Sequence, residues 1–268
     1  MVPTLSCRPA IAGALMMALV ACSDSPTEPG GDAAEVASTD VASVAGDQTF
    51  EDISAMRHHG GAFSALPAPL PRFGPWSDDC TFDSASSRFT CPELTHAGFT
   101  HTRSYQLLDG NGTPQSSYDA TATASANFTG STSGSAARNG FSATFSRQRT
   151  FTVSGLEGAE TAHTWNGTGT ANHARTRHTE GGLTRGYAMT SSSTVTGVVL
   201  SFPPAAEGWP LAGTILRQVS FSRDGSAGPG RSGTRTVTVT FNGTQFVPMT
   251  VNDHAFTLDL ATGRPVRD

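Results

Sequence analysis

Alternation of apolar and polar residues is the strongest pattern in the second half of the chain. In RTVTVTFNG, Val237, Val239 and Phe241 fall on one face of an extended strand, and threonines fall on the other. FSATFSRQRTFTVSG and TGTILRQVSFSRDG alternate in the same way, and FVPMTV followed by AFTLDLATG predicts a terminal hairpin. These stretches therefore predict strands with one buried face and one face rich in hydroxyl groups.

Turn residues between such stretches predict how the strands connect. Asn111-Gly112 suits a tight turn, and a turn centred there would set Tyr105 opposite Tyr118. No segment after Gly61 shows a convincing helical pattern of ten or more residues. Residues 78–268 are therefore predicted to form an all-β domain, an antiparallel meander of roughly ten strands. Such a sheet would hide its edges by curling into a barrel-like form or folding into a sandwich.

The region before this domain has a different pattern. TFEDISAMRHHGG predicts one short helix, with Thr49 and Asp52 at its start and a glycine pair at its end. Prolines between Pro67 and Pro75 then predict an extended connector, so residues 47–77 are assigned as a short helix and a Pro-rich connector. Residues 22–46 are rich in Ala, Ser, Asp, Glu, Pro and Gly, and are predicted to be a disordered tether.

The amino-terminal residues indicate the compartment. Arg8 precedes an apolar run from Pro9 to Ala21 that is short for a membrane span and is typical of a signal peptide, residues 1–21. The run ends in Leu19-Val20-Ala21-Cys22, where the chain resembles the bacterial lipoproteins, whose lipobox ends in Ala or Gly before an obligatory Cys. The resemblance implies cleavage before Cys22 and acyl chains on that residue, which would anchor the protein in the cell envelope. The alternatives are an ordinary secretory signal with a chance Cys and a short membrane helix; whether the anchor sits in the inner or outer membrane stays open.

With Cys22 lipidated and Cys7 removed, Cys80 and Cys91 are the remaining cysteines of a chain outside the reducing cytoplasm. A disulfide bond is then the expected state of the pair. The intervening CTFDSASSRFTC reads almost the same in both directions, which predicts a hairpin with Phe82 opposite Phe89 and a four-residue loop. A zinc site would need closely spaced pairs and further ligands, and a redox site would usually show C-x-x-C.

Composition limits the classes of partner. The net charge is −5, all seventeen basic residues are Arg, and no basic stripe is present, which argues against nucleic-acid binding. The sequence contains no nucleophile-elbow or metalloprotease motif, and no cofactor or metal is expected.

The histidines are the remaining candidates for chemistry. His163 and His173 lie near Trp165 in AHTWNGTGTANHARTRH, and a turn at Asn166-Gly167 would place His163 opposite Thr170. Surface or packed strand histidines are the simpler interpretation, so no catalytic or metal-ligating residue is assigned.

Three classes of function follow from these observations. The favoured one is a non-enzymatic envelope lipoprotein whose β domain binds an apolar or amphiphilic, lipid-like ligand or an envelope protein. The second is a structural or adhesive surface protein, suggested by the tether and the Thr-rich faces. The third is an envelope hydrolase, which would need His163 or His173 beside a carboxylate or hydroxyl in a cleft.

Overall fold

The structure, a computed structural model, describes residues 33–57, 80–96, 98–138, 141–158, 160–178, 184–202, 208–225 and 231–268. These residues form one helix, α1 (Ala33–Arg57), and fourteen strands. The first six strands are β1 (Thr81–Asp83), β2 (Arg88–Thr90), β3 (Leu94–His96), β4 (Phe99–Asp109), β5 (Pro114–Gln115) and β6 (Thr123–Arg138). Of these, β4 and β6 are long and the others are short. The long central strands are β7 (Phe141–Ser154), β8 (Ala162–His178), β9 (Thr184–Ser201), β10 (Ala212–Gly225) and β11 (Arg231–Thr240). The chain ends with β12 (Phe246–Val251), β13 (His254–Asp259) and β14 (Arg264–Arg267).

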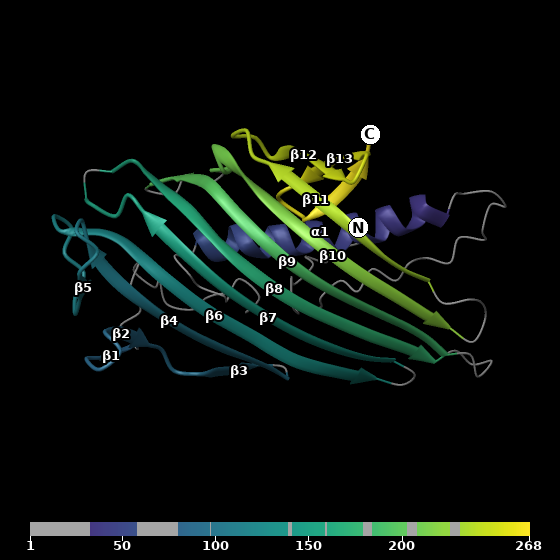
Figure 1. Ribbon diagram of the computed structural model, residues 1–268, viewed down its shortest axis with the longest axis horizontal. Helices are drawn as coiled ribbons and strands as arrows, with labels where there is room; N and C mark the ends of the chain where they lie inside the picture. Colours follow the sequence, from purple (N-terminus) through teal and green to yellow (C-terminus); the bar gives the residue numbers. More distant parts are fainter. Residues whose placement is uncertain are drawn as a thin grey trace, which may run out of the picture.

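All fourteen strands belong to one antiparallel sheet in which most strands pair with their neighbours along the chain. The prediction of an all-β antiparallel meander is confirmed, with more strands than the roughly ten expected, but the expected barrel-like form is wrong. The sheet is open, because β1 and β14 end the path of paired strands, and α1 lies across one of its faces (Figure 1). We call the face that carries α1 the inner face and the opposite one the outer face.

The predicted alternation places the expected residues on the inner face. In β11 and the residue after it, Val237, Val239 and Phe241 are buried, while Thr240 is exposed. The terminal hairpin also forms, with Val251 of β12 opposite His254 of β13. Hydrophobic burial on one side and hydration on the other therefore fix the register of these strands, since a slip of one residue would exchange the two faces.

The predicted pairing of Tyr105 with Tyr118 is wrong. The turn at Asn111-Gly112 forms, and Gly112 donates its amide hydrogen to the Asp109 carbonyl at 3.0 Å. However, β5 spans only two residues before the chain leaves β4, and the much longer β6 places Phe128 opposite Tyr105. Tyr118 instead donates its hydroxyl hydrogen to the carbonyl of Leu156 at 2.8 Å. A turn signal in the sequence thus did not determine which strand becomes the main partner.

The predicted turn at Asn166-Gly167 is also wrong, because β8 continues through both residues. A β-bulge occurs there, and Asn166 Oδ1 accepts a hydrogen bond from the Gly197 amide of β9 at 2.8 Å. At Gly167 an added Cβ would collide with the carbonyl oxygen of Thr150 and the ring of Phe151. The Asn-Gly pair therefore serves a bulge and a close strand contact here, and not a reversal of the chain.

The predicted disordered tether, residues 22–46, is wrong for its second part, because α1 begins at Ala33 and continues to Arg57. The short helix predicted around Thr49 is the last part of this longer helix. Val41, Ala45 and Met56 lie buried on a single stripe with helical spacing. Gly46 stays inside the helix because it approaches the β13–β14 turn so closely that a Cβ would overlap the carbonyl oxygen of Gly263. Tertiary packing therefore overrides the weak helix propensity of this segment.

Other predictions fall outside the described residues. They concern the signal peptide at 1–21, Cys22, and the part of the 47–77 connector that follows α1. In the described part of the chain, no helix is both long enough and apolar enough to cross a bilayer.

Candidate binding surfaces on the two faces of the sheet

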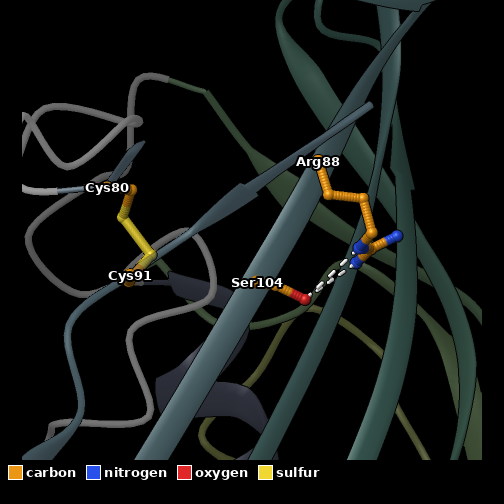
Figure 2. The surroundings of a disulfide bond; sticks show 4 residues. All are labelled: Cys80, Arg88, Cys91 and Ser104. Atoms are coloured by element: carbon orange, nitrogen blue, oxygen red, sulfur yellow. Dashed lines mark hydrogen bonds between the residues drawn. A yellow bond between two sulfur atoms is a disulfide. The ribbon is translucent and has the colours of Figure 1, made fainter. Parts of the chain in front are cut away.

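The cysteine hairpin forms as predicted at one edge of the sheet. Cys80 and Cys91 are joined by a disulfide bond (Figure 2). Phe82 lies opposite Phe89 in the β1–β2 pair. The four loop residues follow β1, and Asp83 caps them by accepting a hydrogen bond from the Ala85 amide at 3.0 Å. The disulfide therefore has a structural role in closing the edge hairpin.

Arg88 fastens this hairpin to the outer face of the sheet. Its guanidinium donates from Nε and Nη2 to Ser104 Oγ of β4, at 3.3 and 3.2 Å (Figure 2). It also donates to Thr129 Oγ1 of β6 at 3.0 Å. Arg88 thus spans two strands beyond its own, which compensates for the short pairing between β2 and β4.

On the inner face, Asp52 of α1 binds three arginines from the sheet. Its carboxylate is 2.6 Å from Arg147 Nη2 and 2.8 Å from Arg149 Nε, both of β7, and it also pairs with Arg217 of β10. Asp52 and Arg217 each expose 2% of their side chains. Such buried charges are tolerated only when they are paired and hydrogen-bonded, so this cluster defines where the helix sits on the sheet.

The electrostatics of Asp52 follow from this arrangement. Burial alone would raise its pKa, but Arg147, Arg217 and Arg149 together lower the pKa of Asp52 to about 2. The second helix carboxylate, Glu51, also pairs with Arg147 and Arg149, but 38% of its side chain is exposed. Asp52, which together with its three arginines we call the Asp52 cluster, is therefore ionised throughout the neutral range.

A row of aromatic rings crosses the inner face near the hairpin edge. Phe89 stacks on Tyr105 with centroids 4.6 Å apart, Tyr105 meets Phe128 at 5.8 Å, and Phe128 meets Trp165 at 5.7 Å. Trp165 is 1% exposed and Tyr105 is 6% exposed. Tyr105 and Trp165 therefore belong to the core, Phe89 and Phe128 pack against it partly buried, and the row supplies packing between the strands.

A second group of rings on the inner face is only half-buried and is mixed with arginines. One cross-strand row runs from Phe145 through His173 and Met189 to Phe221. The next row runs from Arg175 through Tyr187 to Arg223. We define the arginine–aromatic strip as seven residues that are all partly or fully exposed: Phe145, His173, Arg175, Tyr187, Phe221, Arg223 and Arg235.

Two of the three arginines of the strip are held by rings. The Arg175 guanidinium lies 4.8 Å from the centroid of the Tyr187 ring, and that of Arg235 lies 5.6 Å from the centroid of Phe221. Cation–π contacts of this kind position a guanidinium without neutralising its charge. The strip is therefore a partly apolar surface with fixed positive charges.

The two candidate histidines lie far apart on β8. Ten residues separate them along one strand, which corresponds to about 33 Å. The His163 ring stacks on Phe202 with centroids 4.4 Å apart, whereas the His173 ring meets the edge of Phe145 at 6.4 Å. Burial and then Arg175 lower the pKa of His173, while Glu51 opposes the shift. The two histidines are therefore not brought into one site.

Metal ligands do not gather in the parts of the chain described here. Within them, no group of three or more His, Cys, Asp and Glu side chains is arranged to hold a metal ion. Asp109, whose DGNGT stretch starts the β4–β5 turn, accepts hydrogen bonds from the amides of Asn111 and Thr113 at 2.9 and 2.7 Å. Its carboxylate thus stabilises the turn.

The outer face carries rows of uncharged polar side chains. Hydrogen bonds link neighbours across strands, including Thr102 to Ser131 at 2.7 Å and Thr236 to Gln218 at 3.1 Å. One such row runs in register through Thr102, Ser131, Gln148, Thr170, Ser192, Gln218 and Thr236. The prediction of a hydroxyl-rich face is confirmed, and the neighbouring strands that carry these side chains lie about 4.8 Å apart.

The Asp52 cluster and the strip were both missed by the sequence prediction. A signal for the cluster was present, because Arg147 and Arg149 have the same alternation phase as Phe145 and Phe151. A charged residue in the buried phase requires a partner of opposite charge. No comparable signal identified the strip, since its residues come together only through the register of five strands.

Comparison of the chain with protein-family models, curated proteins and solved structures found no match.

Proposed function

We propose that the protein is a bacterial envelope lipoprotein, anchored through Cys22, that binds an amphiphilic ligand on the inner face of its sheet and has no catalytic role. The observation that carries the proposal is the arginine–aromatic strip, where rings such as Phe145 and Phe221 are left half-buried beside a packed core. Partly exposed aromatic side chains next to a few fixed polar groups are typical of ligand sites. The lipobox supports the envelope location.

Ligand binding is tested by native mass spectrometry of the chain from residue 22 onward, carrying Cys22→Ser and purified without detergent. Because α1 is part of the fold, the chain must retain it. The proposal predicts an adduct of lipid mass, or one that forms on adding hexadecanoate. A bare polypeptide under both conditions would contradict it.

The anchor is tested separately by membrane fractionation. Wild-type protein should sediment with membranes, and Cys22→Ser should appear in the soluble fraction because its acyl chains are missing. Cys7→Ser is the matched control, since Cys7 lies within the predicted signal peptide. An unchanged membrane fraction for Cys22→Ser would exclude the lipobox interpretation.

A second candidate is a structural or adhesive surface protein, and the outer face is the observation that favours it. The outer face carries rows of uncharged polar side chains. The row that runs from Thr102 to Thr236 contains no charged residue. Such a surface suits neutral, hydroxyl-rich partners. Binding of the Cys22→Ser chain to neutral polysaccharide beads, abolished by Thr170→Arg at the centre of that row, would favour this function over ligand carriage.

A further inference from the structure

We infer that the arginine–aromatic strip receives the anionic head group of an amphiphile, a carboxylate or phosphate, with the apolar tail lying over the neighbouring aromatic row. This inference rests on the proposed function and specifies the chemical class of its ligand. It is carried by the register of β8, β9 and β10, which places Arg175, Tyr187 and Arg223 side by side.

The rows of the inner face place apolar surface beside positive charge. The row of Val219 also holds Arg147 and Arg235, but Val219 is 1% exposed and Arg147 is paired with the helix carboxylates. The adjacent row presents the half-buried rings of Phe145 and Phe221, and the next presents Arg175 and Arg223. Consecutive rows on one face are about 6.7 Å apart, so a head group held by Arg175 and Arg223 would leave its apolar tail beside the aromatic row.

Charge distinguishes the strip from the Asp52 cluster. Arg147, Arg149 and Arg217 are all paired with helix carboxylates. Within the described residues, by contrast, the contacts of Arg175 are with the Tyr187 ring, and no ion pair joins Arg175 or Arg223 to a carboxylate. Their guanidinium hydrogens therefore point to an anion from outside the chain, which arginine binds through two parallel hydrogen bonds.

Gly233 of β11 leaves space for this arrangement. An added Cβ there would lie 3.0 Å from Phe221 Cζ and 3.5 Å from Arg235 Nη1. Because Gly233 has no side chain, the Phe221 ring and the Arg235 guanidinium can lie over its backbone in β11. Arg235 also donates from Nη1 to the Thr234 carbonyl at 3.0 Å, which fixes its head beside the ring.

The inference is tested by calorimetric titration of the Cys22→Ser chain with hexadecanoate, with hexadecanol and with inorganic phosphate. Hexadecanoate should bind more tightly than the neutral alcohol. The double variant Arg175→Gln/Arg223→Gln should weaken hexadecanoate binding at least tenfold, about the effect of losing one charge-assisted hydrogen bond, and should leave hexadecanol binding unchanged. Arg175→Lys/Arg223→Lys keeps the charge and should retain most of the affinity, and Arg264→Gln on β14 is the control for charge removal elsewhere.

The contradicting results are distinct from one another. Unchanged hexadecanoate affinity in the Gln double variant would overturn the head-group site while leaving the proposed function standing. Inorganic phosphate binding as tightly as hexadecanoate would overturn the placement of a tail over the aromatic row. Failure of both hexadecanoate and hexadecanol to bind the wild-type surface would overturn the proposed function itself.

Discussion

Asp52 is the buried carboxylate that joins the helix to the sheet through charge, beside the partly exposed Glu51. Replacing it with Asn keeps its size but leaves Arg147 and Arg217 buried without a counter-charge. Asp52→Asn should therefore lower the free energy of unfolding by about 3–5 kcal/mol in urea denaturation. Glu51→Gln is the matched control on the same helical turn, and should cost about 1 kcal/mol or less because Glu51 is partly exposed. Equal losses for the two variants would contradict a specific role for Asp52.

The pH dependence gives a second check on the same residue. The folded-state pKa of Asp52, about 2, lies below the usual value of 3.8 for an aspartate. Its carboxylate therefore contributes stability that is fully present above about pH 4 and is lost as the pH falls through 2. The stability difference between wild type and Asp52→Asn should shrink over that interval. A difference that stayed constant down to pH 2 would argue against ionised Asp52 as its source.

Asp47, on the same helix, should act in the opposite direction. Burial, and then Glu51, raise the pKa of Asp47 to about 6, although Arg264 lowers it in part. Because the folded state holds the proton more tightly than the unfolded state, stability falls as the pH rises from about 4 to 6. Asp47→Asn should remove this decrease, as measured by urea denaturation at a series of pH values. Parallel curves for wild type and variant would contradict the shift.

At the scale of elements, α1 is the part of the fold that the sequence predicted least well, because its first part was expected to be disordered. Its amino-terminal half consists of small and polar residues, and only the Asp52 region resembled a helix with a capping box. The strands were predictable because alternation reports one buried face directly. Helix docking was not, because it depends on small residues such as Ala45 and Gly46 that allow close approach and carry little hydrophobic signal.

Gly46 provides the sharpest test of this docking. Ala would normally favour a helix by about 1 kcal/mol, but at this position its Cβ would overlap the backbone of Gly263. A backbone atom cannot rotate away, so overpacking of about 1–3 kcal/mol should outweigh the propensity gain, and Gly46→Ala should lower stability. Gly110→Ala is the control, because nothing lies within 4 Å of its Cβ position. A stabilising Gly46→Ala would show that the helix is not held against the β13–β14 turn.

At the scale of the whole molecule, the sheet assigns different tasks to its two faces. The outer face carries uncharged hydrogen-bonding rows, whereas the inner face holds a helix, a packed aromatic row and the arginine–aromatic strip. The near-palindrome from Cys80 to Cys91 predicted the disulfide hairpin, and sequence alternation predicted the buried face and the hydroxyl-rich face. It could not predict the strip, because Arg175 and Arg223 lie almost fifty residues apart and meet only through strand register. The prediction of a turn at Asn166-Gly167 failed for the same reason, because Gly167 is needed for a close contact between strands that only the register creates.

The position of α1 decides how much of the inner face is open to a ligand, so its docking is the claim to measure first. Amide hydrogen exchange of the wild-type chain, read by mass spectrometry over residues 41–57, measures that docking directly. A helix locked by Asp52 should exchange about a thousandfold or more slowly than an unstructured peptide, at a level near that of β10 and β11. Exchange as fast as in an unstructured peptide would show that α1 is not held on the sheet and would contradict the Asp52 cluster.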